Sequence, residues 1–126
     1  MVSNLKKLTA LCESYTSGYS ELLYELERET HLKTLNPQMM SGHLQGRFLS
    51  LLSRLKRPKA ILEIGTFTGY AAICLAEGLQ AEGTLHTIEV NPELESLCRR
   101  YFRKAGLEKR IHLHLGNAFE IIPQLK

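Results

Sequence analysis

The chain has 126 residues, of which 44% are hydrophobic and 23% are charged, and it contains no tryptophan. This length predicts one globular domain with a single core and excludes two domains. The net charge of +3 is too small to indicate a nucleic-acid partner, and no apolar run reaches the roughly 18 residues of a membrane-spanning helix. Because the N-terminus also lacks a signal-peptide pattern, we expect a cytoplasmic protein without a membrane partner.

Residues 1–57 show the residue spacing of three helices. Apolar residues recur every three to four positions, so each helix should have one apolar face. The second helix is expected to begin after Ser20, and the third is expected to be capped by Ser41 and to end at Arg57, before Pro58. The apolar faces comprise Leu5, Leu8, Leu11, Cys12 and Tyr15 in the first helix, Leu22, Leu23 and Leu26 in the second, and Leu44, Phe48, Leu51, Leu52 and Leu55 in the third. We expect the apolar face of the third helix to pack against a partner surface.

Beyond Pro58, short apolar runs alternate with helical segments, which is typical of a parallel α/β sheet. The expected elements are strands at residues 60–64, 84–90 and 111–115, and helices at residues 70–79, from Pro92 to Gly106, and briefly after Asn117. Asn91 is the expected N-cap of the helix that starts at Pro92, and Gly106 marks the end of that helix. This β-α-β-α-β succession predicts an α/β fold.

The strongest signal for a binding site follows the first strand, where Glu63 precedes a turn that contains Gly65 and Gly69. In open α/β sheets, ligands bind at the carboxyl ends of the strands, and glycines let them approach the backbone. The spacing E-x-G-x-x-x-G differs from the G-x-G-x-x-G of dinucleotide sites, and the Glu63 carboxylate would repel a pyrophosphate. The pattern therefore favours a ligand with cationic character, against the simpler alternative of a glycine turn without a ligand.

A second carboxylate, Glu89, ends the next strand. About 20 residues beyond the glycine turn is where Rossmann-type proteins bind ribose hydroxyls. The third strand ends in Gly116-Asn117-Ala118-Phe119, whose amide and ring can contact a base; a helix cap followed by a core phenylalanine explains these residues equally well. The expected site thus combines a glycine turn, a carboxylate for ribose and a pocket for a base. Together these features predict a nucleoside cofactor without phosphates, and S-adenosylmethionine is the obvious candidate.

The histidines give no comparable signal. His112 and His114 alternate on the third strand and should face the same side, but two histidines without a third ligand are more often packing or edge residues. His31, His43 and His86 have no obvious partners in the sequence. No metal site is expected from them.

The chain resembles the small-molecule O-methyltransferases of the catechol and caffeoyl-CoA type, within the class I S-adenosylmethionine-dependent methyltransferases. Four stretches carry the resemblance: MMSGHLQGRFLSLL, EIGTFTGYAA, TIEVNPE and AGLEKRIHLHLGNAFEIIPQL. It implies a Rossmann-like parallel sheet with strand order 3-2-1, preceded by an N-terminal helical cap segment, residues 1–57, that covers the cofactor. Residues 58–126 would then be the first half of the S-adenosylmethionine-binding domain, and the methyltransferase fold would be incomplete.

The resemblance also implies a role for particular residues. It places Met39 and Ser41 against the cofactor, Glu63 near the methionine amino group, Gly65, Thr66, Phe67, Gly69, Tyr70 and Ala71 around the methionine carboxylate and ribose, Glu89 on the ribose hydroxyls, and Asn117, Ala118 and Phe119 around the adenine. Many relatives have an acidic residue where Asn117 stands.

The resemblance implies a divalent metal, usually Mg²⁺, that presents a phenolic hydroxyl of a small substrate to the methyl sulfonium. The family holds this metal with residues that follow a fourth strand. The sequence ends at Lys126, before any matching segment, so neither a metal ligand nor a catalytic residue is assigned to this chain. We therefore expect the chain to be inactive alone.

In the family's strand order, residues 60–64 would form an unpaired apolar edge. We expect the chain either to be half of a longer enzyme or to self-associate, as a homodimer, to protect that edge. Three other functions stay open: a tRNA hydroxyuridine O-methyltransferase of the same family, a nicotinamide-dependent reductase, and a non-catalytic assembly module that uses the open edge.

Overall fold

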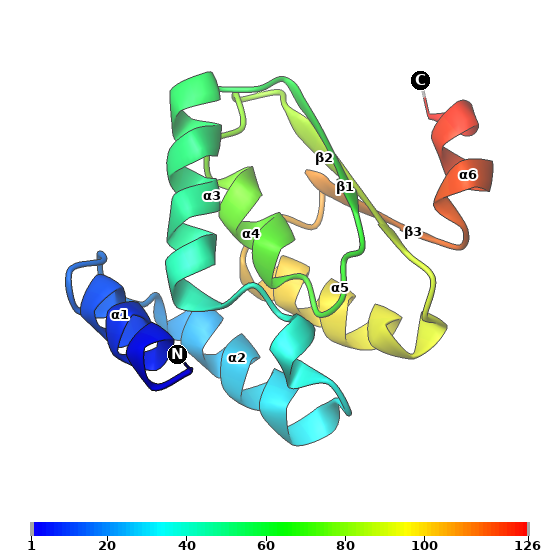
Figure 1. Ribbon diagram of the computed structural model, residues 1–126. Helices are drawn as coiled ribbons and strands as arrows, with labels where there is room; N and C mark the ends of the chain where they lie inside the picture. Colours follow the sequence, from blue (N-terminus) through cyan, green and yellow to red (C-terminus); the bar gives the residue numbers. More distant parts are fainter. Residues whose placement is uncertain (1, 126) are drawn as a thin grey trace.

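The computed structural model describes residues 2–125. Its elements are α1 (Val2–Ser14), α2 (Glu21–Lys33), the 3-10 helix η1 (Pro37–Met39), α3 (Gly42–Lys56), β1 (Ala60–Ile64), α4 (Tyr70–Ala76), β2 (Thr84–Glu89), the 3-10 helix η2 (Pro92–Leu94), α5 (Glu95–Lys104), β3 (Ile111–Leu115), α6 (Ala118–Ile121) and the 3-10 helix η3 (Ile122–Gln124) (Figure 1). The three expected strands are confirmed. Helix α4 ends at Ala76, earlier than predicted, and the chain then turns at Gly78.

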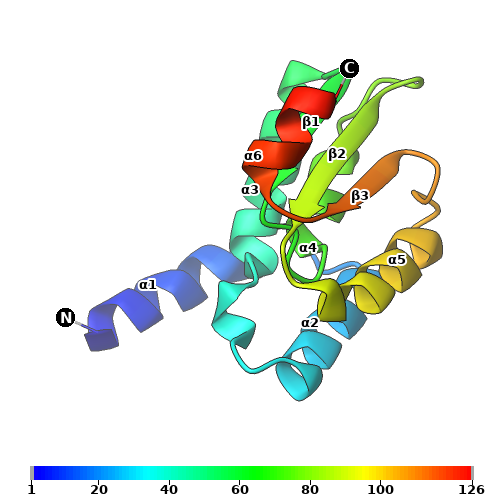
Figure 2. The ribbon, with the colours of Figure 1, turned by 90° about the vertical axis from the view of Figure 1, so that its right-hand side faces the viewer.

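The strands form one parallel sheet in the order β1-β2-β3, which confirms the expected Rossmann-like arrangement (Figure 2). Glu63 pairs in register with Thr87, and Glu89 pairs with Leu115. Because all three strands run the same way, the turns that follow them meet at one end of the sheet, beyond the carboxyl ends of the strands. The residues of the predicted site lie at this end.

One face of the sheet is covered by helices α2 to α5, whereas α6 lies on the other side (Figure 1). The covered face holds the core, which includes Leu23, Leu26, Tyr70, Ile73, Leu85, Leu97, Tyr101, Phe102, Ile111 and Leu113. On the side of α6, Leu62 and Ile64 of β1 remain 48% and 63% exposed. Within the described residues β1 pairs with β2 alone, so it forms the expected open edge.

Helix α2 joins the core as predicted. The Ser20 hydroxyl accepts a hydrogen bond from the amide of Leu23, which caps the helix. Further along, the Glu29 carboxylate accepts from Lys33 and from Arg100 and Tyr101 of α5. The Lys33 ammonium, together with these donors from α5, lowers the pKa of Glu29 to about 2. An ionised Glu29 therefore ties α2 to α5 at neutral pH.

Helix α3 contradicts the sequence analysis in the face that it buries. Its small and polar residues His43, Gly46, Ser50 and Ser53 are buried, Gly46 and Ser53 against α4, whereas most of its apolar face is exposed. The Ser53 hydroxyl donates to the carbonyl of Leu75 at 2.6 Å, and a Cβ at Gly46 would lie 2.7 Å from the Tyr70 ring. Close approach of the two helices thus requires small residues. Ser41 precedes α3 but its side chain makes no capping hydrogen bond, so that expectation was wrong.

Three histidines meet on the sheet face opposite the core. His86 Nδ1 lies 2.9 Å from His114 Nε2, and the rings of His86 and His112 are 4.9 Å apart. His86 therefore has partners that the sequence did not reveal, and His112 and His114 face the same side as expected. Burial, followed by the neighbouring histidines, lowers the pKa of His86. Among residues 2–125, no group of three or more His, Cys, Asp or Glu side chains is placed to hold a metal ion.

Candidate functional site

The turn between β1 and α4 has a left-handed backbone at three positions. Gly65 and Gly69 have φ values of +90° and +92°, and Phe67 has φ 50°. A Cβ at Gly65 would meet nothing within 4 Å, whereas one at Gly69 would lie 2.7 Å from the Phe102 ring. Gly65 therefore leaves open space beside the backbone, and Gly69 lets the turn pack tightly on α5.

Glu89 supports this turn directly. Its side chain is 8% exposed, and its two oxygens accept from the amide of Phe67 at 2.8 Å and from that of Asn91 at 2.9 Å. Each carboxylate oxygen has a second lone pair, so Glu89 can hold the turn and still accept from a ligand hydroxyl. The sequence predicted only a ribose contact for Glu89; the support of Phe67, in its unfavourable conformation, is additional.

Glu63 lies beneath the turn in a chain of hydroxyl hydrogen bonds. The Thr87 hydroxyl donates to the Glu63 carboxylate at 2.6 Å, and it lies 2.6 Å from the Thr66 hydroxyl. Because Thr87 has only one hydroxyl hydrogen, Thr66 is the donor to Thr87. Burial, reinforced by the charge of Glu89, raises the pKa of Glu63 to about 7 although the Thr87 hydrogen bond acts in the opposite direction. Glu63 is thus poised to ionise when a cation arrives.

Helix α2 holds the turn through a contact that the sequence did not predict. Thr30 and Thr68 are both fully buried, and the Thr30 hydroxyl lies 3.0 Å from that of Thr68 and 2.8 Å from the carbonyl of Leu26. Thr68 stands in the middle of the glycine turn. The only signal in the sequence was a threonine on the apolar face of α2, which does not identify a partner 38 positions away.

Two cavities border the turn. The smaller, of about 30 Å³, brings the predicted residues Met39 and Ser41 against residues 65–71. The larger, of about 370 Å³, extends from Met39 and Phe67 to Glu89 and along the end of α2. The structure therefore joins the segment after α2 to the turns that follow β1 and β2, as the expected cap over a ligand requires.

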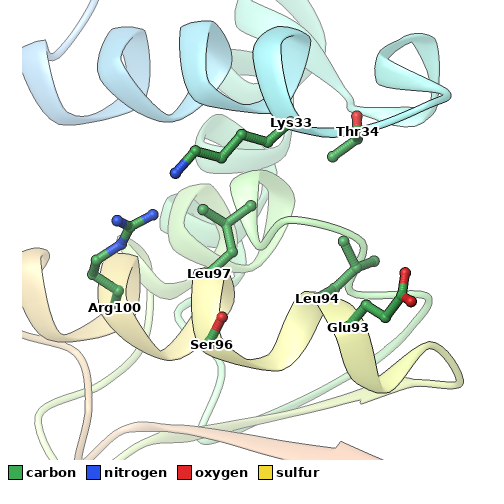
Figure 3. A pocket seen from close by; sticks show the side chains of 7 residues that line it. All are labelled: Lys33, Thr34, Glu93, Leu94, Ser96, Leu97 and Arg100. Carbon is green, nitrogen blue, oxygen red and sulfur yellow. The ribbon is translucent and has the colours of Figure 1, made fainter.

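A third hollow, of about 380 Å³, opens next to the larger cavity between α2 and α5. Figure 3 shows Lys33 and Arg100 pointing toward each other across Leu97. Both cations bind Glu29, so the charge in this hollow is engaged in the link between the helices. No residue of the predicted site lines it.

The segment after β3 lies close to Glu89 and leaves the ring of Phe119 exposed. The Gly116 amide donates to the Glu89 carbonyl at 2.9 Å, and the Asn117 side chain accepts from the amide of Phe119 at 2.9 Å. The helix-cap interpretation of Asn117 is therefore confirmed. Phe119 is 89% exposed, so its interpretation as a core residue was wrong, and its ring is free to contact a ligand.

Comparison with known proteins agrees with this geometry. A family model described as O-methyltransferase matches residues 13–126. A catechol O-methyltransferase of Niastella koreensis is 40% identical over 81 residues, which cover 64% of this chain and 37% of that protein. The catechol O-methyltransferase of Bos taurus is 34% identical over 103 residues, which cover 82% of this chain and 35% of the bovine protein.

Among solved structures, a methyltransferase of Podospora anserina bound to SAH superposes with a TM-score of 0.91 at 30% identity. The match covers 98% of this chain and 53% of the fungal protein. The chain thus spans between about a third and a half of the length of these relatives. Because the family model matches nearly the whole chain, the chain belongs to the O-methyltransferase family.

Proposed function

We propose that the chain binds S-adenosylmethionine at the carboxyl ends of β1, β2 and β3, as the cofactor-binding portion of an O-methyltransferase. The observation that carries this proposal is the pair of carboxylates, Glu63 and Glu89, on either side of an open glycine turn. S-adenosylmethionine has an ammonium group in its methionine part, a ribose diol in its adenosine part, and no phosphate. The pair therefore matches this cofactor better than it matches a dinucleotide.

The site residues divide according to the parts of the cofactor. We assign the ammonium to Glu63, the ribose hydroxyls to Glu89, and the methionine carboxylate to the amides of residues 65–71. Met39 and Ser41 close the site from the other side, where they already border the turn. Asn117, Ala118 and the exposed ring of Phe119 would contact the adenine.

In the proposed reaction, the acceptor oxygen bonds to the methyl carbon as the carbon–sulfur bond breaks, which releases S-adenosylhomocysteine and the hydroxyl proton. The Mg²⁺ that the family resemblance implies would lower the pKa of that hydroxyl. Residues 2–125 hold no cluster fit to bind it, so its ligands and the catalytic groups would lie outside this chain. We accordingly propose that the chain is inactive alone.

We propose a small phenolic compound of the catechol or caffeoyl kind as the methyl acceptor, because both curated relatives named above are catechol O-methyltransferases. A hydroxylated tRNA base is the second candidate within the family. None of the helices in the described part of the chain is long and apolar enough to cross a membrane. A cytoplasmic location is part of the proposal.

An assay with a labelled methyl group tests whether the chain binds the cofactor without transferring its methyl group. The chain is incubated with S-adenosylmethionine carrying a labelled methyl group, Mg²⁺, and either a catechol or a tRNA that contains hydroxyuridine. We expect the cofactor to bind without label reaching either acceptor. Transfer to catechol by the purified chain would overturn the proposed inactivity but support the acceptor class, whereas absence of binding would overturn the proposal itself.

The pKa of Glu63 leads to a pH prediction. An ammonium group favours the ionised carboxylate, so affinity for S-adenosylhomocysteine should rise as the pH increases through about 7. If only ionised Glu63 binds, the increase from pH 6 to pH 8 is about tenfold. Calorimetric titration at several pH values measures it, and Glu63→Gln is the control that should flatten the profile. A wild-type profile as flat as that of the variant would contradict the assignment.

A further inference from the structure

The hydroxyl of Thr30 gives the glycine turn a fixed link to helix α2. It lies within hydrogen-bond distance of two oxygens, the hydroxyl of Thr68 and the carbonyl of Leu26. Because a carbonyl only accepts, both contacts are satisfied when Thr30 donates to Leu26 and Thr68 donates to Thr30. Thr30 and Thr68 are both 0% exposed, so water cannot replace either partner. The side chain of Thr68 is therefore held in one direction, toward α2.

Thr68 is the point at which α2 reaches the turn. The residues at the start of the turn are held from the sheet, because the amides of Gly65 and Thr66 both donate to the carbonyl of Ile88 in β2. Within residues 2–125, the Thr68 hydroxyl has Thr30 as its only hydrogen-bond partner. The turn is thus fixed to β2 on one side and to α2 on the other.

The backbone of Thr30 also fixes the end of α2. Its carbonyl accepts from the amide of Thr34 at 3.1 Å and from the Thr34 hydroxyl at 2.7 Å. Thr34 and Met39 line the larger cavity, and the smaller cavity lies between Met39, Ser41 and the turn. One residue therefore holds both walls of the site: the turn through its hydroxyl, and the segment that faces the turn through its carbonyl.

We propose that Thr30 is a positioning residue of the cofactor site, whose hydroxyl holds the glycine turn in the position in which it faces residues 34–41. The proposal rests on the proposed function, because it takes the turn to bind S-adenosylmethionine. Thr30 itself does not contact the ligand. An aliphatic side chain at this position would fill the space but leave the Thr68 hydroxyl buried without a partner, which favours rearrangement of the turn.

Variants that differ only in the hydroxyl test this role. Thr30→Val should weaken the binding of S-adenosylhomocysteine roughly two- to tenfold, the range expected for one lost hydrogen bond. Thr30→Ser keeps the hydroxyl and should restore most of the affinity. The matched control is Thr9→Val, because the hydroxyl of Thr9, at an exposed position of α1, makes the same intrahelical bond to the carbonyl of Leu5. Calorimetric titration should show wild-type affinity for this control.

A double variant separates positioning from stability. Thr30→Val should lower the melting temperature because it buries an unpaired hydroxyl, whereas Thr30→Val/Thr68→Val removes both hydroxyls and should recover most of that loss. We expect the affinity of the double variant to stay low, since the turn has lost its link to α2. Affinity that recovers together with the melting temperature would show a merely structural role and overturn the proposal, as would unchanged affinity in Thr30→Val.

Hydrogen exchange without ligand keeps this proposal distinct from the proposed function. The amides of Gly65 and Thr66 should exchange faster in the double variant than in the wild-type chain, whereas those of β3 should exchange at the same rate in both. Equal rates at the turn would overturn the proposal even if the cofactor binds. A wild-type chain that binds no S-adenosylhomocysteine would overturn the proposed function, and the exchange rates would still decide whether Thr30 positions the turn.

Discussion

Replacing Glu89 by alanine is expected to weaken the binding of S-adenosylhomocysteine by roughly 10- to 100-fold. A hydrogen bond to a charged acceptor contributes about 1.5–3 kcal/mol, which corresponds to this range. The variant also leaves the amides of Phe67 and Asn91 without their acceptor, so the glycine turn loses its support. Calorimetric titration of wild type and variant measures the effect at a temperature at which circular dichroism shows both to be folded.

Two controls separate the charge of Glu89 from its support of the turn. Glu89→Gln keeps an acceptor but removes the charge, so it should retain more of the stability than Glu89→Ala and bind with intermediate affinity. Glu82→Ala removes an exposed carboxylate in another turn and should change nothing. Unchanged affinity in Glu89→Ala would refute the ribose assignment.

Replacing Gly78 by alanine should lower the free energy of unfolding more than any other substitution proposed above. A Cβ at this position would lie 2.2 Å from the backbone carbonyl carbon of Ser53. Backbone atoms cannot move aside as a flexible side chain can, so α3 must separate from α4. Overpacking in a core typically costs about 1–3 kcal/mol, and we expect at least the upper end of that range, or roughly 10 °C in the melting temperature.

Thermal unfolding followed by circular dichroism measures this loss. Gly18→Ala is the matched control, because its Cβ would meet nothing within 4 Å and its φ is not in the left-handed region. It should leave the melting temperature unchanged or raise it slightly. If Gly78→Ala and Gly18→Ala melt together, the close packing of α3 on α4 is wrong.

The strands could be predicted to the residue at β1 and β3 because apolar runs between turn residues define short buried strands. The packing of α3 could not. Its pattern identified an apolar face correctly, but a pattern does not say which face has a partner within the chain. The interface with α4 instead depends on Gly46 and Ser53, which allow close backbone approach and which hydropathy does not distinguish from solvent-exposed positions.

The arrangement of the candidate site was predictable where its residues are consecutive or end a strand. The sequence predicted that Glu63, Gly65 and Glu89 lie near one another, because the carboxyl ends of parallel strands converge. The hydrogen bond between Thr30 and Thr68 could not be predicted, because it joins residues 38 positions apart whose types are equally common in unrelated roles. The raised pKa of Glu63 was also hidden, since it results from burial and from the nearby charge of Glu89.

Calorimetric titration of the wild-type chain with S-adenosylhomocysteine tests the central claim most directly. We predict saturable one-to-one binding, weak because only part of the relatives' length is present, and no binding of NADH under the same conditions. Binding of NADH in preference to S-adenosylhomocysteine, or no detectable heat from the folded chain with the nucleoside, would contradict the proposed cofactor site.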